Sequence, residues 1–341
     1  MHGHVLVRPG EIAFRQLPRP VAGPGEIVVR VRAALTCGTD IKAFLRGHPK
    51  FPMPTPFGHE FSGEVAEVGA GVHRFREGDP IMAVPTAPCG QCYYCDRQQE
   101  NLCDTVMDTM VLGAYAEYLK LPARIVNVNV FHKPATLPFP VAALLEPLAC
   151  VLHGLEAVTL RPDDSVALLG AGAISLLHLL ALRTMGVARI LVIGRGPTRA
   201  QHARRLGADE VFVGDLGTAR DRTLAYTHGR GADVVIECTG QVDVWEAAPA
   251  LARRGGHVVL FGGCPPGTRM HVDTQRLHYD QLRITSPFHF TPRAVRRAYD
   301  MLTDGGFDGA SLITGVLPLE QLPRALREHQ RGNGIKFAVV P

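Results

Sequence analysis

The chain has 341 residues and a mass of 36.9 kDa, a length that suits two domains better than one core. Hydrophobic residues make up 46% and charged residues 20% of the sequence, which excludes wholesale disorder. The formal net charge is +4, and the 31 Arg and five Lys residues are scattered among 32 acidic residues, so we expect no nucleic-acid partner.

Neither a membrane span nor an export signal is predicted. No stretch approaches the roughly 18 to 20 uninterrupted apolar residues of a membrane helix, so we expect no membrane partner. The first residues, MHGHVLVRPGEIAF, contain no apolar signal core followed by a small-residue cleavage site. Eight cysteines without a signal indicate thiols or metal ligands in a reducing compartment, and we expect a cytoplasmic protein.

The first 145 residues are predicted to be rich in β-structure. Residues 27–33 (IVVRVRA) form a β-branched run after a Gly-Pro-Gly turn. Residues 64–68 form a second short strand, and residues 111–121 contain a third. Pro and Gly punctuate the whole region, as in a partly open barrel of short strands.

Strands and helices alternate from Pro162 onward. Apolar strands are expected at residues 166–169, 189–193, 211, 234–237 and 257–261. Helices are expected at residues 174–185, 199–206 and 245–252. Short connections between alternating strands and helices predict a parallel sheet with helices on both faces. A further helix at 292–303 and a strand at 336–340 end the chain.

Four cysteines follow one another in a short polar segment. Cys89, Cys92, Cys95 and Cys103 give the spacing C-x2-C-x2-C-x7-C. Four thiolates so close together can surround one zinc ion tetrahedrally at about 2.3 Å. Because four sulfurs leave no open coordination position, we predict a structural zinc site, in preference to ordinary thiols or a disulfide pair.

A second set of candidate metal ligands is spread along the chain. Cys37 lies in the run CGTD, His59 and Glu60 lie in GHE, and Glu146 begins the run EPLA. One thiolate, one imidazole and one or two carboxylates form a mixed zinc shell with room for water or substrate. Taken singly, a cysteine or a histidine of this kind is more often a core or surface residue.

The combination of these motifs resembles the zinc-containing medium-chain alcohol and polyol dehydrogenases, in particular the sorbitol and threonine dehydrogenase branch. Residues 58–72, GHEFSGEVAEVGAGV, fit the family signature G-H-E-x2-G-x5-G-x2-V at every fixed position. The cysteine segment and the downstream nucleotide-binding unit match as well. The resemblance implies an α/β chain with a GroES-like, partly open β-barrel and a Rossmann-type doubly wound parallel sheet.

The resemblance also implies a division of the chain and a site. Residues 1–147 would form the catalytic zinc domain, with a structural zinc lobe at 86–104. Residues 148–286 would bind the dinucleotide, and residues 287–341 would return to the catalytic domain. Cys37, His59 and either Glu60 or Glu146 would hold a catalytic zinc, giving two zinc ions per chain. Cys150, one helical turn after Glu146, could compete as a ligand, but we interpret it as a core residue.

Thr39 is implied as the proton-relaying catalytic residue, together with Cys37 and His59 at the metal. Many relatives carry a histidine three residues after this threonine, where this chain has Lys42, which would contact the cofactor or solvent. Asp40 is interpreted as a turn or ion-pair residue.

A glycine-rich turn follows the strand at 166–169 and opens a helix. Gly170 allows the tight turn, and Gly172, Ala173 and Ile174 place the backbone and the helix N-terminus against a pyrophosphate. Ser175 stands where the third glycine of the fingerprint is usual. By resemblance, Phe261, Gly262 and Gly263 lie near the nicotinamide.

The loop after the second strand of this unit predicts the type of cofactor. An NAD site normally places Asp or Glu about 20 residues on, to bind the ribose diol. Here no acidic residue occurs between Ser175 and Ala208, and the loop begins with Gly194 and Arg195, with Arg199 following. Because guanidinium groups bind a 2′-phosphate, we predict NADP(H) over NAD(H), although both arginines could instead face solvent or stack on adenine.

The resemblance implies a zinc-dependent oxidoreductase that transfers hydride reversibly between a secondary alcohol and NAD(P). A polyol, sugar alcohol or amino alcohol is the favoured substrate class, and relatives form homodimers or homotetramers. Phe44, Met110 and Phe288 are pocket candidates that could equally be core residues. The alternatives are a zinc-independent quinone or enoyl reductase of the same superfamily and a non-catalytic nucleotide-binding protein.

Overall fold

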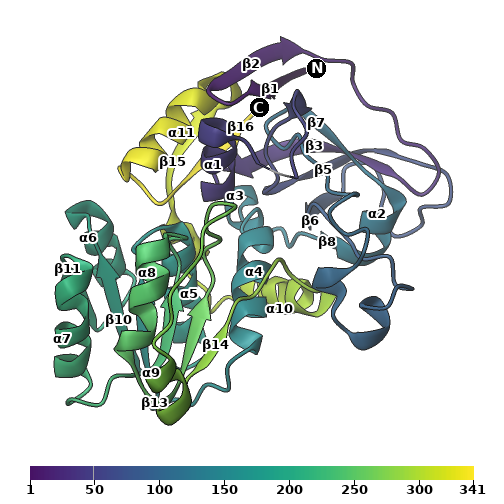
Figure 1. Ribbon diagram of the computed structural model, residues 1–341. Helices are drawn as coiled ribbons and strands as arrows, with labels where there is room; N and C mark the ends of the chain where they lie inside the picture. The colour runs from purple at the N-terminus through teal and green to yellow at the C-terminus, as the bar shows by residue number, and fades with distance from the viewer. Residues whose placement is uncertain (49) are drawn as a thin grey trace. The chain divides into compact units, whose positions relative to one another are not determined.

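The computed structural model describes residues 1–48 and 50–341, which form two compact units. The first unit comprises Met1–Cys150 and Phe290–Pro341, and the second comprises Val151–His289. The chain therefore leaves the first unit, forms the second as one continuous segment, and returns, as the colours of Figure 1 let the reader follow.

The first unit is built on a seven-stranded sheet of order β15-β16-β3-β5-β6-β8, with β7 paired to β3, and a small sheet β2-β1-β4. Its strands are β1 (His2–Arg8), β2 (Glu11–Gln16), β3 (Ile27–Leu35), β4 (Thr55–Pro56), β5 (Phe61–Val68), β6 (Pro80–Ala83), β7 (Tyr118–Leu121), β8 (Val130–His132), β15 (Ile313–Pro318) and β16 (Lys336–Val340). The strands predicted near residues 27–33, 64–68 and 336–340 are present. In the region 111–121, only the last four residues form a strand.

Short helices connect these strands and cover the sheet. They are α1 (Gly38–Arg46), α2 (Ala123–Asn129), α3 (Phe139–Ala142), α4 (Leu145–Glu156), α10 (Pro292–Thr303) and α11 (Leu322–Arg331), with 3-10 turns at Cys95–Arg97, Glu100–Leu102, Gly309–Leu312 and Leu319–Gln321. The first half of α4 belongs to the first unit and its second half, from Val151, to the second. The stretch Phe139–Glu156 is long and apolar enough to cross a membrane, with a mean hydropathy of 1.4, yet 72% of it is buried in the protein. It has the burial of a core helix.

The pairing of β3 with β5 forms the core of the first unit and also positions its chemistry. Most β3 side chains are fully buried, and each such Val or Ile contributes roughly 1.5–3 kcal/mol. The strands are antiparallel, and Ala34 of β3 lies opposite Phe61 of β5. Just beyond this pair, the Leu35 N–H donates to the Glu60 carbonyl at 3.1 Å. The chain leaving β3 and the chain entering β5 are thus held side by side.

The second unit contains a six-stranded sheet in which every pair of neighbouring strands is parallel. The order β11-β10-β9-β12-β13-β14 is that of a doubly wound dinucleotide-binding sheet. The strands are β9 (Ser165–Leu169), β10 (Arg189–Gly194), β11 (Glu210–Val213), β12 (Ala232–Glu237), β13 (Ala252–Leu260) and β14 (Arg283–Thr285). The order reverses between β9 and β12, where such sheets bind ligands at the carboxyl ends of their strands.

Helices connect the strands of the second unit. They are α5 (Ala173–Thr184), α6 (Pro197–Arg205), α7 (Leu216–Tyr226), α8 (Val242–Ala247) and α9 (Thr274–Tyr279), with a 3-10 turn at Ala248–Leu251. The helix predicted at residues 245–252 begins earlier and ends at Ala247. Pro249 has no N–H to continue an α-helix, so the chain tightens into the 3-10 turn.

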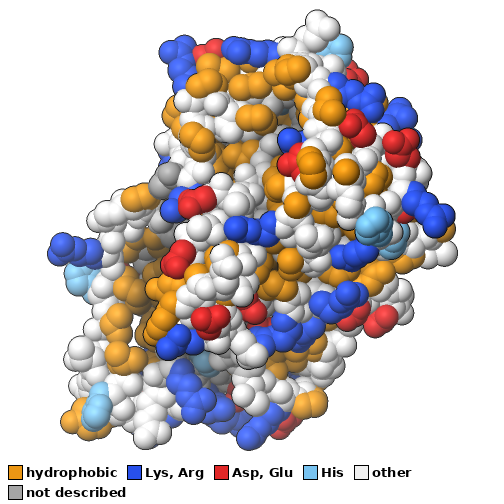
Figure 2. Space-filling model, turned by 90° about the vertical axis from the view of Figure 1, so that its right-hand side faces the viewer, with side chains coloured by type: hydrophobic (Ala, Val, Ile, Leu, Met, Phe, Trp, Pro, Cys, Tyr) orange, Lys and Arg blue, Asp and Glu red, His pale blue; other side chains and the backbone are white. Residues whose placement is uncertain are grey.

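Charged side chains of both signs are visible on one face of the molecule. On the face drawn in Figure 2, Lys and Arg side chains lie among Asp and Glu side chains, with hydrophobic side chains between them. This distribution agrees with the small formal charge of +4.

Candidate metal centres and dinucleotide site

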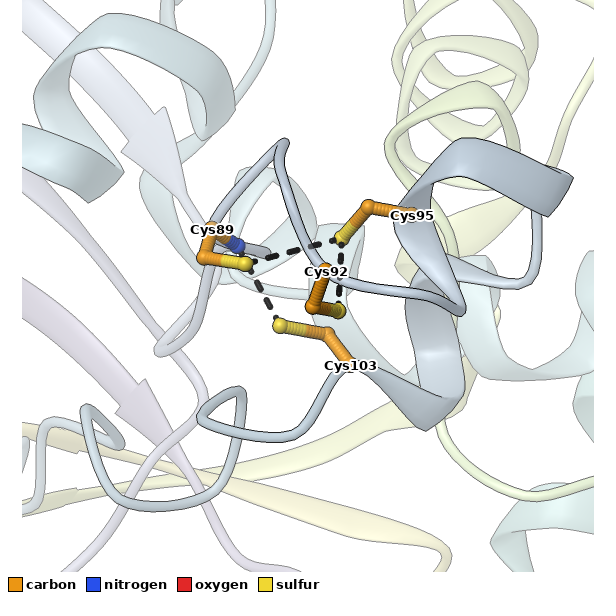
Figure 3. A group of neighbouring side chains, drawn as sticks. All are labelled: Cys89, Cys92, Cys95 and Cys103. Carbon is orange, nitrogen blue, oxygen red and sulfur yellow. Dashed lines mark hydrogen bonds between the residues drawn. The ribbon is translucent and has the colours of Figure 1, made fainter.

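The four cysteines of the 86–104 segment converge on one point, as Figure 3 shows. The Sγ atom of Cys95 lies 3.5 Å from that of Cys92 and 3.9 Å from that of Cys89, and the Cys89 N–H donates to Cys103 Sγ at 3.2 Å. Four sulfurs around zinc, each about 2.3 Å from the metal, are separated by about 3.8 Å. The observed spacing therefore fits a tetrahedral zinc site.

The thiols of this cluster differ in how readily they ionise. Burial opposes ionisation of Cys103, but N–H donors at Cys89 and Thr105 outweigh it and lower the pKa of this thiol to about 6. Burial and the neighbouring thiols hold the pKa of Cys95 at about 12. All eight cysteines of the chain lie in its described part and are free thiols. Four sulfurs at this spacing can all ionise only if a metal compensates their charge.

A second cluster brings together Cys37, His59 and Glu60. One ligand atom from each lies within 4.8 Å of the others, and the three side chains are buried. Cys37 caps the N-terminus of α1, where its Sγ accepts the Thr39 N–H at 3.4 Å. His59 and Glu60 directly precede β5, so the β3–β5 pairing described above holds the three ligands together.

A buried carboxylate lies next to the imidazole of His59. Nδ1 of His59 lies 3.0 Å from Oδ1 of Asp40, and both side chains are almost completely buried. A ligating histidine is typically oriented in this way by a carboxylate on its other nitrogen, which leaves Nε2 for a metal. Burial acts to lower the pKa of His59, but Asp40 and Cys37 outweigh it and raise that pKa well above its usual value. The ion-pair interpretation of Asp40 is confirmed, and its partner is the candidate ligand itself.

Glu60 has one oxygen held and one oxygen unpartnered. Its Oε2 accepts a hydrogen bond from Nζ of Lys336 at 2.5 Å, and the same Nζ also donates to the Thr36 carbonyl at 3.1 Å. Among the described residues, Oε1 of Glu60 finds no hydrogen-bond partner although it is buried. A buried, unpartnered carboxylate oxygen beside a thiol and an imidazole fits a metal ion or its bound water. Sequence reasoning missed Lys336, because its strand (KFAVV) has the pattern of a buried strand.

Glu146 lies in the first turn of α4 and is buried as well. Burial raises the pKa of its carboxyl to about 7, while His59 and Lys336 partly oppose this shift through their charges. The Cys150 thiol, one helical turn later, donates to Oε1 of Glu146 at 3.7 Å. Glu146 therefore contributes to the electrostatics of the cluster, whereas Glu60 is the carboxylate within the cluster itself.

The remaining candidates of the first unit are partly buried. Thr39 occupies the second position of α1 and is half-buried. Phe44 and Met110 pack against the main hydrophobic cluster. Phe288, in the second unit, is half exposed.

The glycine-rich turn has the geometry of a dinucleotide site. Gly170 follows β9 with a φ of +106°, and a Cβ there would lie 3.0 Å from the Thr239 side chain. Gly172 caps α5, and a Cβ there would meet open space. Ala173 and Ile174 form the first turn of α5, whose N–H groups and dipole favour an anion at this end.

The end of β10 faces this turn. A Cβ on Gly194 would lie 2.8 Å from the Ala171 Cβ, so a small residue is required where the two loops meet. Arg195 is exposed and forms an ion pair with Asp243 at 3.4 Å. Arg199 lies in the first turn of α6, and burial lowers its pKa. Sequence reasoning did not foresee Asp243, which lies 48 residues away in the chain.

The segment after β13 lies beside the loop after β12. The N–H groups of Phe261 and Gly262 donate to the Glu237 carbonyl at 2.9 and 3.0 Å. The Gly262 carbonyl accepts the Trp245 indole N–H at 2.9 Å. Gly263 follows directly. These residues thus lie at the carboxyl edge of the parallel sheet, the edge that also carries the glycine-rich turn.

Comparison with known proteins agrees with both units. Residues 23–130 match the model of the alcohol dehydrogenase GroES-like domain, and residues 173–304 match that of zinc-binding dehydrogenases. D-altritol 5-dehydrogenase of Agrobacterium fabrum is 31% identical over 94% of each chain, and sorbitol dehydrogenase of Bacillus subtilis is 28% identical over 96% of this chain and 92% of its own.

Solved structures are similar over the whole chain. A Sinorhizobium meliloti protein assigned to the zinc-binding dehydrogenases, whose crystal structure contains NADP, has a TM-score of 0.89 at 30% identity, with 100% of this chain and 99% of that chain covered. An alcohol dehydrogenase of Thermus sp. ATN1 has a TM-score of 0.89 at 29% identity with the same coverage.

The fold and the two metal-binding patterns define an oxidoreductase with a GroES-like domain and a Rossmann-type domain. The chain belongs to the zinc-containing medium-chain alcohol and polyol dehydrogenases, and it is a zinc-dependent enzyme that uses a nicotinamide cofactor. The predicted family and fold class are confirmed. The zinc-independent and non-catalytic alternatives are set aside, because the chain matches the model of the zinc-binding dehydrogenases and contains a buried cluster of candidate metal ligands.

Proposed function

We propose that the enzyme oxidises a secondary hydroxyl group of a polyol, a sugar alcohol or an amino alcohol, and reduces the corresponding ketone. Relatives that cover nearly the whole chain are named for D-altritol, sorbitol and L-threonine. These compounds share a secondary hydroxyl group on a carbon flanked by other polar groups. The observation that carries the proposal is the buried cluster of Cys37, His59 and Glu60.

Cys37, His59 and Glu60 would hold the catalytic zinc, with Glu146 as the alternative carboxylate ligand. When bound, zinc supplies a Lewis acid that polarises the substrate oxygen and favours loss of its proton. Asp40 holds His59 in the orientation that presents Nε2, and Lys336 holds one oxygen of Glu60 so that the other stays available.

Thr39 would carry the proton away from the substrate hydroxyl. Its backbone N–H donates to Cys37 Sγ, which keeps the residue next to the metal ligand, while its side chain is half-buried. A hydroxyl group both accepts and donates a proton, so it can pass one on without itself becoming charged. Lys42, one turn along α1, remains a candidate contact of the cofactor or of solvent.

The second unit would bind the dinucleotide along the carboxyl edge of its sheet. Gly170, Gly172, Ala173 and Ile174 would bind the pyrophosphate, and residues 261–263 would face the nicotinamide ring, which accepts or donates the hydride. Gly194, Arg195 and Arg199 would receive the 2′-phosphate of NADP. The absence of any acidic residue between Ser175 and Ala208 supports NADP over NAD.

Further features of the enzyme follow from the same assignment. The four-cysteine lobe would hold a second, structural zinc, giving two zinc ions per chain. Residues 1–147 and 287–341 would form the catalytic domain and residues 148–286 the cofactor domain, a division supported by the changes of unit after Cys150 and after His289. We also propose a homodimer or homotetramer in the cytoplasm.

A substrate panel tests the proposal. The zinc-loaded enzyme is assayed with sorbitol, D-altritol, L-threonine and ethanol, each with NADP⁺ and NAD⁺. We expect the highest kcat/KM with a compound carrying a secondary hydroxyl group, and with NADP⁺. Turnover of ethanol alone, or of none of these secondary alcohols with either cofactor, would overturn the proposed substrate class.

A further inference from the structure

Tyr115 fills a buried position that connects three segments of the first unit. Its side chain is 0% exposed. The ring lies against Gly58, where φ is +92° and where a Cβ would come within 2.6 Å of the ring. The Tyr115 N–H donates to the Phe57 carbonyl at 2.9 Å. The aromatic ring therefore supports the turn that directly precedes His59.

The hydroxyl group of Tyr115 contacts two acceptors. It lies 2.8 Å from the Leu35 carbonyl oxygen and 2.7 Å from Oδ2 of Asp40. Leu35 ends β3, two residues before Cys37, and the other oxygen of Asp40 lies 3.0 Å from His59 Nδ1. One phenol oxygen thus lies between the strand end that leads to one candidate ligand and the carboxylate that lies next to another.

A role confined to packing would not require this hydroxyl group. A phenylalanine would fill the space against Gly58 equally well, and burying a hydroxyl group is unfavourable unless it is hydrogen-bonded. Burial and Asp40 raise the pKa of Tyr115 well above its usual value, so the group stays a donor. Asp40 is itself 0% exposed, and a buried carboxylate with a free rotamer would not hold an imidazole in one orientation.

We propose that Tyr115 is a positioning residue of the catalytic metal centre, whose hydroxyl group fixes Asp40 and thereby the ring orientation of His59. The inference rests on the proposed function, because it takes Cys37 and His59 as zinc ligands. It adds Tyr115, which contacts Asp40 and not the candidate metal ligands, to the residues that support the site.

The experiment measures metal retention instead of activity alone. Purified Tyr115→Phe and wild-type enzymes are loaded with zinc, and the rate of zinc release to a chromogenic chelator is followed. Tyr299→Phe is the matched control, since its hydroxyl group donates to a main-chain carbonyl, that of His132, at 3.2 Å in the same unit. The four-cysteine site provides an internal reference in every sample, because Tyr115→Phe should not change zinc release from it.

Outer partners of metal ligands typically change metal affinity by about 10- to 100-fold. We expect zinc release from the catalytic site to accelerate by about that factor in Tyr115→Phe, and the visible spectrum of the cobalt-substituted site to shift, with Tyr299→Phe unchanged. Release rates and cobalt spectra equal to those of the wild type would overturn the proposal.

A second pair of variants keeps the test independent of folding. In an Asp40→Asn background, adding Tyr115→Phe should change zinc release little, because both substitutions break the same chain of contacts. Fully additive effects would contradict the proposal. A wild-type enzyme that binds metal only at the four cysteines would instead refute the proposed function, and the two failures are therefore distinguishable.

Discussion

Lys336, in the last strand, and Glu60, just before β5, form a buried ion pair across 276 residues of sequence. Both side chains are almost completely inaccessible to solvent, at 1% and 0% exposure. The pair joins the returning C-terminal segment to the candidate metal centre. It also leaves the second oxygen of Glu60 without a hydrogen-bond partner among the described residues.

Removing this lysine should destabilise the first unit strongly. Lys336→Met leaves a buried carboxylate without its cation, and breaking such a pair costs about 3–5 kcal/mol. Urea unfolding of the zinc-loaded enzyme measures the loss. Lys120→Met is the control, because the Lys120–Glu26 pair is partly exposed and contributes at most about 1 kcal/mol. Equal losses in the two variants would contradict the buried-pair account.

The four-cysteine lobe should depend on its metal. Cys95→Ser removes one sulfur from the tetrahedral set, so we expect the loss of about one zinc per chain and a lower Tm. Elemental analysis and thermal unfolding measure the two effects. Cys264→Ser, which removes a thiol outside both clusters, should leave both values unchanged. An unchanged Tm in Cys95→Ser would argue against a structural metal.

The two arginines after β10 should decide between the cofactors. Arg199→Ala removes a partly buried guanidinium, and we expect Kd for NADP⁺ to rise by about 10- to 100-fold and Kd for NAD⁺ to change far less. Arg195→Ala should act in the same direction more weakly, because Asp243 already shares its charge. Isothermal titration with both cofactors measures this difference. The exposed Arg230, changed to Ala, is the control. Equal losses for the two cofactors would count against a 2′-phosphate site.

The stability of the second unit should fall in mild acid because of His178. Burial lowers the pKa of this side chain to about 4, below its usual 6.5, so protons bind the unfolded chain more readily. The stabilisation is complete above pH 6.5 and is lost as the pH falls toward 4, to an extent of about 3 kcal/mol. His178→Leu should flatten the dependence of the free energy of unfolding on pH in this range. Parallel curves for variant and wild type would contradict the assignment.

Local motifs were predictable and long-range partners were not. The four-cysteine site and the turn at Gly170 can be recognised from short stretches of sequence, because their chemistry requires particular residue types close together in the chain. The alternation of strands and helices likewise predicted the parallel sheet. Lys336 and Tyr115 carry no such signal, since each lies in a stretch whose pattern is that of ordinary core.

Asp40 illustrates the same limit at short range. Its position in the first turn of α1 has a sufficient local explanation, because acidic residues favour helix N-termini. Only the pairing of β3 with β5 brings His59 to it. The three-dimensional structure is therefore needed to distinguish an acidic residue that only stabilises a helix N-terminus from one that lies next to a metal ligand.

Zinc analysis of Cys37→Ser tests the central claim most directly, because this thiol belongs to the proposed catalytic cluster and not to the four-cysteine lobe. The account predicts about two zinc ions per chain in the wild type, and about one in an otherwise folded Cys37→Ser variant that no longer turns over alcohol. A Cys37→Ser enzyme that keeps both zinc ions and full activity would contradict it.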